Sequence, residues 1–158
     1  MNLKDYFEST WDARARLLDA CASLTREEWT REFPFSWKTV QRLFGHIIEV
    51  ERSWMLEDIE QTSYAWGGDE ARERLYGTVD LTLATSREVQ AITRRILEAY
   101  VPGRLAENRS GKDAHGHPAT FTVEQILTHV FTHELRHQGQ IQAMLRLLEK
   151  PAPNADWI

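Results

Sequence analysis

The sequence lacks the features that mark secreted and membrane proteins. Its 158 residues contain one cysteine, Cys21, so no intrachain disulfide can form and a reducing cytoplasm is the expected location. The N-terminus carries acidic residues where a secretory signal has its apolar core, and no apolar run reaches membrane-spanning length. We therefore expect a cytoplasmic protein without a membrane partner. Cys21 lies on the apolar side of a predicted helix, which favours a buried packing residue over a nucleophile.

An excess of positive charge is also absent. Lys and Arg total 19 against 24 Asp and Glu, the formal net charge is -5, and the basic residues are scattered. Because binding to a phosphate backbone needs concentrated cationic charge, this composition argues against nucleic acid as a partner. The 42% apolar and 27% charged residues are typical of a globular protein, and the length suits one domain over residues 1–158.

Apolar side chains recur at helical spacing along four segments, which predicts an all-α fold. The predicted helices run over about 3–24, 36–60 with Ser36 as N-cap, 80–100, and 122–149 with a Thr122 to Gln125 capping box. Residues 61–79 show no sustained period and are interpreted as a long connection that permits a crossover. Residues 104–121 carry turn chemistry, so a small hairpin and an ordered loop both stay open.

Histidines form the main chemical signal. His129, His133 and His137 follow one another at i, i+4 and i+8, so they share one face of the last helix. His137 falls in the middle of the apolar stripe that a bundle would bury, where an unpaired imidazole is costly. Ligation of a metal ion removes that cost, and His46, which flanks the apolar stripe of the second helix, supplies a third ligand.

Three histidines without a fourth protein ligand leave coordination positions open, as in catalytic metal sites. A divalent ion held there would acidify a bound water into a nucleophile. Three imidazoles and water suit zinc, nickel, cobalt, iron and manganese in different degrees, and availability often decides among them. The alternative is that the histidines pack and form hydrogen bonds within the core. His129 is interpreted as a residue behind the ligands or in the packing around them.

Four carboxylates lie close to these histidines in the sequence. Each could accept a hydrogen bond from the outer nitrogen of a metal-ligating histidine or act as a general base: Glu49, Glu51, Glu57 and Glu134. For each of them, an exposed surface carboxylate is the favoured interpretation.

Two further groups have simpler interpretations. His115 and His117 lie in a polar segment, where a solvated loop is favoured over a second ligand pair. Trp54, Tyr64 and Trp66 form either the wall of a substrate pocket or part of the core and a subunit interface.

Three segments together carry a family resemblance. They are FSW at residues 35–37, LFGHIIEVE at 43–51 and HVFTHELRHQGQI at 129–141, and residues 151–157 also suit the pattern. The chain resembles the DinB/YfiT-like family of metal-binding four-helix bundles over nearly its whole length. The motif His-x-x-x-His-x-x-x-His-x-Gly-Gln is specific when it follows an upstream histidine at this distance.

The resemblance implies an up-down-down-up bundle with a long crossover between its second and third helices. It also implies one divalent ion held by His46, His133 and His137, and a homodimer. Relatives of this kind are thiol transferases and isomerases that use bacillithiol, mycothiol or glutathione, besides hydrolases. The expected partner is therefore a small-molecule substrate and a low-molecular-weight thiol.

Three functions follow from these observations. The leading hypothesis is an enzyme in which the ion activates a cosubstrate thiol or a water toward an electrophile. The second is a non-catalytic binding or stress-response protein that the metal stabilises. The third is a helical interaction module without metal.

Overall fold

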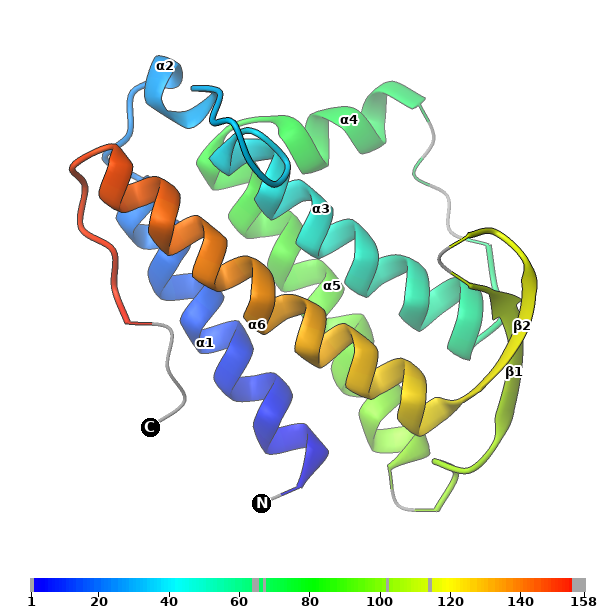
Figure 1. Ribbon diagram of the computed structural model, residues 1–158. Helices are drawn as coiled ribbons and strands as arrows, with labels where there is room; N and C mark the ends of the chain where they lie inside the picture. Colours follow the sequence, from blue (N-terminus) through cyan, green and yellow to red (C-terminus); the bar gives the residue numbers. More distant parts are fainter. Residues whose placement is uncertain (1, 64–65, 67, 102, 114, 155–158) are drawn as a thin grey trace.

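The protein is a helical bundle with a small hairpin at one end. The computed structural model describes residues 2–63, 66, 68–101, 103–113 and 115–154. Its long helices are α1 (Leu3–Cys21), α3 (Val40–Ser53) with the continuous π-helix η1 (Trp54–Ile59), α5 (Val79–Tyr100) and α6 (Val123–Leu147). Figure 1 shows α1 and α6 running one way and α3 and α5 the other, which confirms the expected all-α, up-down-down-up bundle. None of the described helices is long and apolar enough to cross a membrane.

The connections contain elements that the sequence patterns only partly indicated. The short helix α2 (Arg26–Trp29) precedes α3, and α4 (Gly68–Tyr76) lies in the stretch interpreted as a connection without regular structure. The open alternative after α5 resolves as a hairpin, because β1 (Asn108–Lys112) pairs antiparallel with β2 (Pro118–Thr122). The long connection expected over 61–79 contains α4, a helix that was not predicted because it buries only Leu75 and so has no apolar stripe to recognise.

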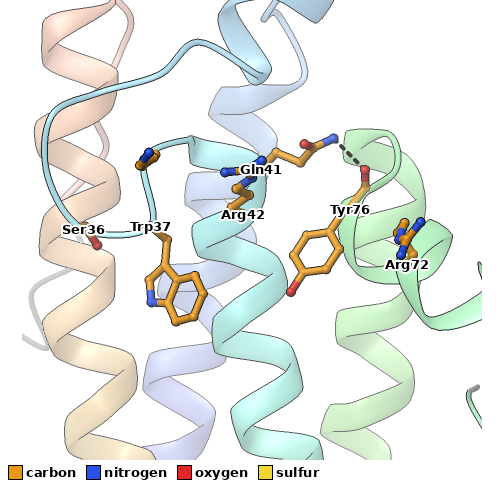
Figure 2. A pocket seen from close by; sticks show the side chains of 7 residues that line it. Ser36, Trp37, Gln41, Arg42, Arg72 and Tyr76 are labelled. Carbon is orange, nitrogen blue, oxygen red and sulfur yellow. Dashed lines mark hydrogen bonds between the residues drawn. The ribbon is translucent and has the colours of Figure 1, made fainter. Parts of the chain in front are cut away.

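Two helix starts show how local chemistry sets the elements. The Thr122 to Gln125 capping box is present as predicted and begins α6. The prediction of Ser36 as N-cap was wrong: α3 begins at Val40 and its N-cap is Thr39. Ser36 and Lys38 instead have φ of 52° and 67°, and this left-handed turn cannot start a right-handed helix. Figure 2 shows Ser36 and Trp37 on this turn ahead of α3.

Apolar residues form a core in two large parts. One part, near α2, includes Leu17, Phe44 and Ile141, and the other, near the hairpin, includes Trp11 and Ile126. Cys21 is fully buried in the first part, and burial raises the pKa of its thiol to about 12, which confirms that it is a packing residue.

A buried arginine joins the helices between these two apolar parts. Arg14 of α1 is 1% exposed, and its Nη2 donates to Glu51 Oε2 of α3 at 2.6 Å. Its Nε donates to Glu134 Oε1 of α6 at 2.9 Å, and its Nη2 also donates to Glu134 Oε2. Its Nη1 donates to Ser86 Oγ of α5 at 3.0 Å. One side chain therefore contacts all three other long helices.

We expect Arg14→Met to destabilise the fold strongly, because it leaves the buried carboxylates of Glu51 and Glu134 without their cation. Removing one partner of a buried ion pair costs about 3–5 kcal/mol, which a urea unfolding curve measures directly. The matched control is Arg95→Met, since Arg95 forms a comparable two-bond pair with Glu60 but is 61% exposed. The control should lose less than about 1 kcal/mol. Equal losses in the two variants would show that the buried network does not hold the helices.

Candidate metal centre

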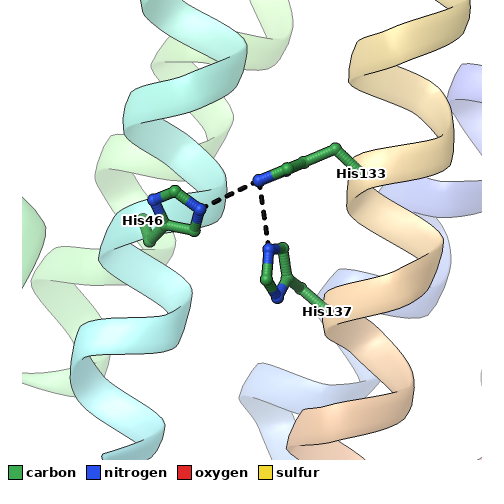
Figure 3. A group of neighbouring side chains, drawn as sticks. All are labelled: His46, His133 and His137. Carbon is green, nitrogen blue, oxygen red and sulfur yellow. Dashed lines mark hydrogen bonds between the residues drawn. The ribbon is translucent and has the colours of Figure 1, made fainter. Parts of the chain in front are cut away.

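Three imidazoles converge between α3 and α6. His133 Nε2 lies 2.9 Å from His46 Nε2 and 3.1 Å from His137 Nε2. One ligand atom from each residue falls within 4.8 Å of the others, and Figure 3 shows the three rings meeting across the gap between the two helices. The expected convergence of His46, His133 and His137 is therefore confirmed, and this group can hold a metal ion.

The tautomer of His137 leaves its inner nitrogen ready to bind. Its Nδ1 lies 2.6 Å from Gln140 Oε1, and an amide oxygen only accepts, so Nδ1 carries the ring hydrogen. Ser36 Oγ donates to the same oxygen at 2.7 Å. His137 Nε2 consequently carries the lone pair, and it lies 3.1 Å from His133 Nε2 and 3.2 Å from the donor Arg136 Nη2. An outer nitrogen held by an acceptor is usual for a metal-ligating histidine.

Hydrogen bonds between neutral rings cannot account for both close contacts of His133 Nε2. His133 Nε2 makes both close contacts, yet one ring nitrogen carries at most one hydrogen, which points at only one neighbour. A cation that accepts a lone pair from each ring satisfies all three at once. In a tetrahedral zinc site with Zn–N near 2.0–2.1 Å, ligand nitrogens lie about 3.3 Å apart. Two of the three separations here, 2.9 and 3.1 Å, are close to that value, and all three ligand atoms lie within 4.8 Å of one another. The donor set therefore fits a divalent ion.

The electrostatic setting keeps these rings neutral, which is the form that binds metal. Burial lowers the pKa of His46 to about 4 and that of His133 to about 3, with a further lowering from neighbouring His137 in both cases. Burial also lowers the pKa of His137. The Arg136 guanidinium adds to each shift, and its Nη2 donates to His137 Nε2 at 3.2 Å. The site thus disfavours a proton on any of its three ligands.

Two residues at this site were not singled out from the sequence. Trp37 stacks on His46 with ring centroids 4.0 Å apart and an interplanar angle of 27°. Gln140 holds His137 from behind, as described above. Both positions fall within the motif segments that carry the family resemblance, and that was the available signal.

The other candidates behind the ligands do not reach the imidazoles. Glu49 accepts two hydrogen bonds from Arg52, at 2.8 and 2.6 Å, and in the described part of the chain it contacts no site histidine. Glu134 is held by Arg14 and Gln138 instead. Both carboxylates are therefore bound by other residues, and the alternative that either one acts as an acceptor or base for the site stays a prediction.

His129 stays outside the group of three. Its ring centroid lies 5.9 Å from that of His133 and 5.0 Å from that of Trp54, so it packs beside the site as expected.

Surface positions were predicted with mixed success. Glu57 is exposed as expected, whereas Glu51 and Glu134 are buried, which corrects the surface interpretation of both. His115 and His117 are exposed in the loop of the hairpin, as predicted.

Of the aromatic residues singled out from the sequence, Trp54 and Trp66 lie in different parts of the structure. Trp54 contacts His129, while Trp66 packs against a separate small cluster that includes Leu75. Tyr64 lies outside the described residues.

Two cavities flank the histidines. One of about 600 Å³ lies between the turn at residues 36–38, Gln41 and Arg42 of α3, and Arg72 and Tyr76 of α4 (Figure 2). The second, of about 430 Å³, is more apolar and is lined by the hairpin, Trp54 and one side of α6 that includes His129. The first cavity meets the site at Trp37, whose ring stacks on His46, and the second meets it at His129, which packs beside His133.

Comparisons with known proteins agree with the fold. The model of the DinB family matches residues 1–158. The chain is 24% identical over 155 residues to the uncharacterized protein YizA of Bacillus subtilis (strain 168), covering 97% of this chain and 92% of that one. A crystal structure of a DinB-like protein from Bacillus cereus ATCC 10987 has the same fold, with a TM-score of 0.66 at 20% identity over 96% of this chain and 91% of the other. The chain belongs to the DinB family.

Proposed function

We propose that this protein is a metal-dependent enzyme of the thiol S-transferase, isomerase or hydrolase type, with one divalent ion held by His46, His133 and His137. The observation that carries the proposal is the convergence of three imidazoles on one point, where His133 Nε2 makes two close contacts that neutral rings cannot both bridge with hydrogens. A non-catalytic protein stabilised by the metal is the alternative, and the activity measurement below separates the two.

The ion would lower the pKa of a thiol or a water at the open coordination positions. The protein's own residues prepare the site for it. Gln140 fixes the tautomer and orientation of His137, and Trp37 covers one face of His46. Cys21 is fully buried in the core, so the reacting thiol belongs to a cosubstrate. Neutral nitrogen ligands favour zinc or nickel over the harder ions manganese and iron.

Protein purified without chelator or nickel resin should contain about one equivalent of a divalent ion by elemental analysis. His133→Ala should lose at least about 90% of it, because His133 provides the nitrogen shared by both close contacts. His129→Ala is the matched control, since His129 lies one turn before His133 just as His137 lies one turn after, but outside the group. Full metal content in the His133 variant would overturn the site.

Zinc affinity should depend only weakly on pH between 7.5 and 5.5. Three imidazoles with an ordinary pKa near 6.5 would lose about a thousandfold in affinity over this range through proton competition. Because burial lowers the pKa of His46 to about 4 and of His133 to about 3, and lowers that of His137, the loss should stay below about tenfold. Titration calorimetry at both pH values measures it, and a thousandfold loss would contradict the neutral, buried ligand set.

The same pKa values set the sign of an effect on stability. The unfolded chain binds protons below pH 6.5, whereas the folded imidazoles bind them only nearer pH 4 and 3, so the metal-free fold loses stability as the pH falls through this interval. Circular dichroism at each pH therefore accompanies the calorimetry and shows that the protein measured is folded.

Metal-loaded protein should accelerate the reaction of a low-molecular-weight thiol with an electrophile such as 1-chloro-2,4-dinitrobenzene. Bacillithiol, mycothiol and glutathione are each assayed, with ester hydrolysis run in parallel for the hydrolase reaction. We expect at least about a hundredfold loss of rate in His133→Ala and less than about threefold in His129→Ala, in line with removal of a metal-activated nucleophile. A loaded protein that accelerates none of these reactions while the metal still raises its melting temperature supports the non-catalytic alternative.

A further inference from the structure

The larger cavity beside the histidines is lined by cations. Lys38 from the turn, Arg42 from α3 and Arg72 from α4 all border it, together with the hydroxyl-bearing Tyr76, and no carboxylate belongs to its lining. Figure 2 shows the Trp37 and Tyr76 rings on opposite sides of α3, with Arg42 between them. The cavity thus joins three positive charges from three segments of the chain.

These cations are not neutralised within the protein. Among the described residues, no carboxylate lies within ion-pair distance of Lys38 or Arg42. Arg72 makes one contact of 4.0 Å with Asp69, and both side chains are almost fully exposed, so solvent screens that pair. Glu49, which lies near Tyr76, is occupied by Arg52. An anion entering the cavity would therefore meet available cationic donors.

The cavity is built against the metal centre. Trp37 is 45% exposed, yet its ring stacks on His46, so it forms a shared wall. Tyr76 is seated on the other side at Gly45, where a Cβ would lie 2.4 Å from Tyr76 Cε1 and 2.5 Å from the Leu75 carbonyl oxygen. Only glycine allows this close approach of the Tyr76 ring to α3.

Backbone strain in the turn at residues 36–38 is a second observation that points to ligand binding at this cavity. Ser36 and Lys38 are both in the left-handed region without being glycine, and they flank Trp37. Such conformations persist where surrounding contacts enforce them, and they cluster at ligand-binding sites. Here the hydrogen bond from Ser36 to Gln140 and the stacking of Trp37 on His46 hold the turn in place. The strained turn presents Trp37 and Lys38 to the cavity.

We propose that this cavity binds the anionic group, a carboxylate or a phosphate, of the small molecule that reacts at the histidines. Arg42 and Arg72 would bind its oxygens through paired N–H donors, Lys38 would add charge, and the Tyr76 hydroxyl would donate a hydrogen bond. A volume of about 600 Å³ suits a ligand of that size. The inference depends on the proposed function only for the reaction that this molecule undergoes, since the cavity is present without an ion.

Metal-free protein tests the inference independently of the metal. The probes are S-methylglutathione, whose thiol is blocked, its diethyl ester, which lacks both negative carboxylates, and inorganic phosphate. Binding is followed by heteronuclear NMR of the tryptophan indole N–H groups, with the Trp37 signal assigned from the spectrum of Trp37→Phe. We expect saturable shifts of the Trp37 signal with at least one of the two anions, and at least tenfold weaker binding of the ester than of S-methylglutathione if the latter binds.

The decisive variant is Arg42→Gln combined with Arg72→Gln, both exposed positions whose replacement should leave the fold intact by circular dichroism. It should bind the active anion at least tenfold more weakly. Arg87→Gln combined with Arg146→Gln removes the same charge from exposed arginines outside the cavity lining and should change affinity less than twofold. Binding of S-methylglutathione alone assigns a carboxylate, and binding of phosphate alone assigns a phosphate.

Three results would overturn the inference: neither anion shifts the Trp37 signal, the cavity variant binds as tightly as the unmodified protein, or the ester binds as tightly as S-methylglutathione. Because no ion is present, none of these results bears on the metal proposal. Conversely, a protein that binds no metal could still bind the anion, so the two proposals fail separately.

Discussion

The bond between Arg14 and two buried carboxylates is the constraint on which the metal centre depends. Glu134 and Gln138 follow His133 and His137 by one residue each, so they point about 100° further around α6. Arg14 holds Glu134, and Gln138 Nε2 donates to the Thr10 carbonyl oxygen of α1 at 2.8 Å. With one face of α6 fixed to α1 in this way, the adjacent face presents both histidines to α3.

The partner helix is fixed by the same network. Glu51 lies five residues after His46 on α3, and it accepts hydrogen bonds from Arg14, from Trp11 Nε1 at 3.1 Å and from Thr93 Oγ1 at 2.7 Å. Buried charges are expensive unless every partner is in place, so a rotation or slip of α3 would break several bonds at once. This polar layer lies between the two apolar parts of the core, where apolar contacts alone would accept small shifts. The ligand set therefore has a defined geometry because an unrelated set of buried bonds aligns its two helices.

The sequence predicted those features that depend on local spacing. Histidines four residues apart must share a face of α6, and a Thr122 to Gln125 capping box must begin a helix, so both were predictable. Glu134 was assigned to the surface because nothing in the sequence around it indicates its partner. That partner is Arg14, which lies 120 residues earlier in the chain. The left-handed turn at Ser36 and Lys38 was equally hidden, since tertiary contacts rather than residue type enforce positive φ in residues other than glycine. Local patterns thus gave the ligands, whereas the long-range contacts that orient them had to come from the structure.

The metal centre consequently has two parts, the histidines on α3 and α6 and the turn at residues 36–38, and different contacts hold each of them in place. His46, His133 and His137 lie on helices that the buried network aligns, while the turn at residues 36–38 is tied to them only at its Ser36 and Trp37 side chains. Ser36 donates a hydrogen bond to Gln140, which in turn accepts one from His137 Nδ1. Trp37 stacks on the ring of His46. A ligand that moves Trp37 or Ser36 would therefore act on the orientation of two imidazoles without disturbing the helices beneath them. In this arrangement the core sets where the donor atoms are, and the strained turn contacts one imidazole directly through Trp37 and another through Gln140.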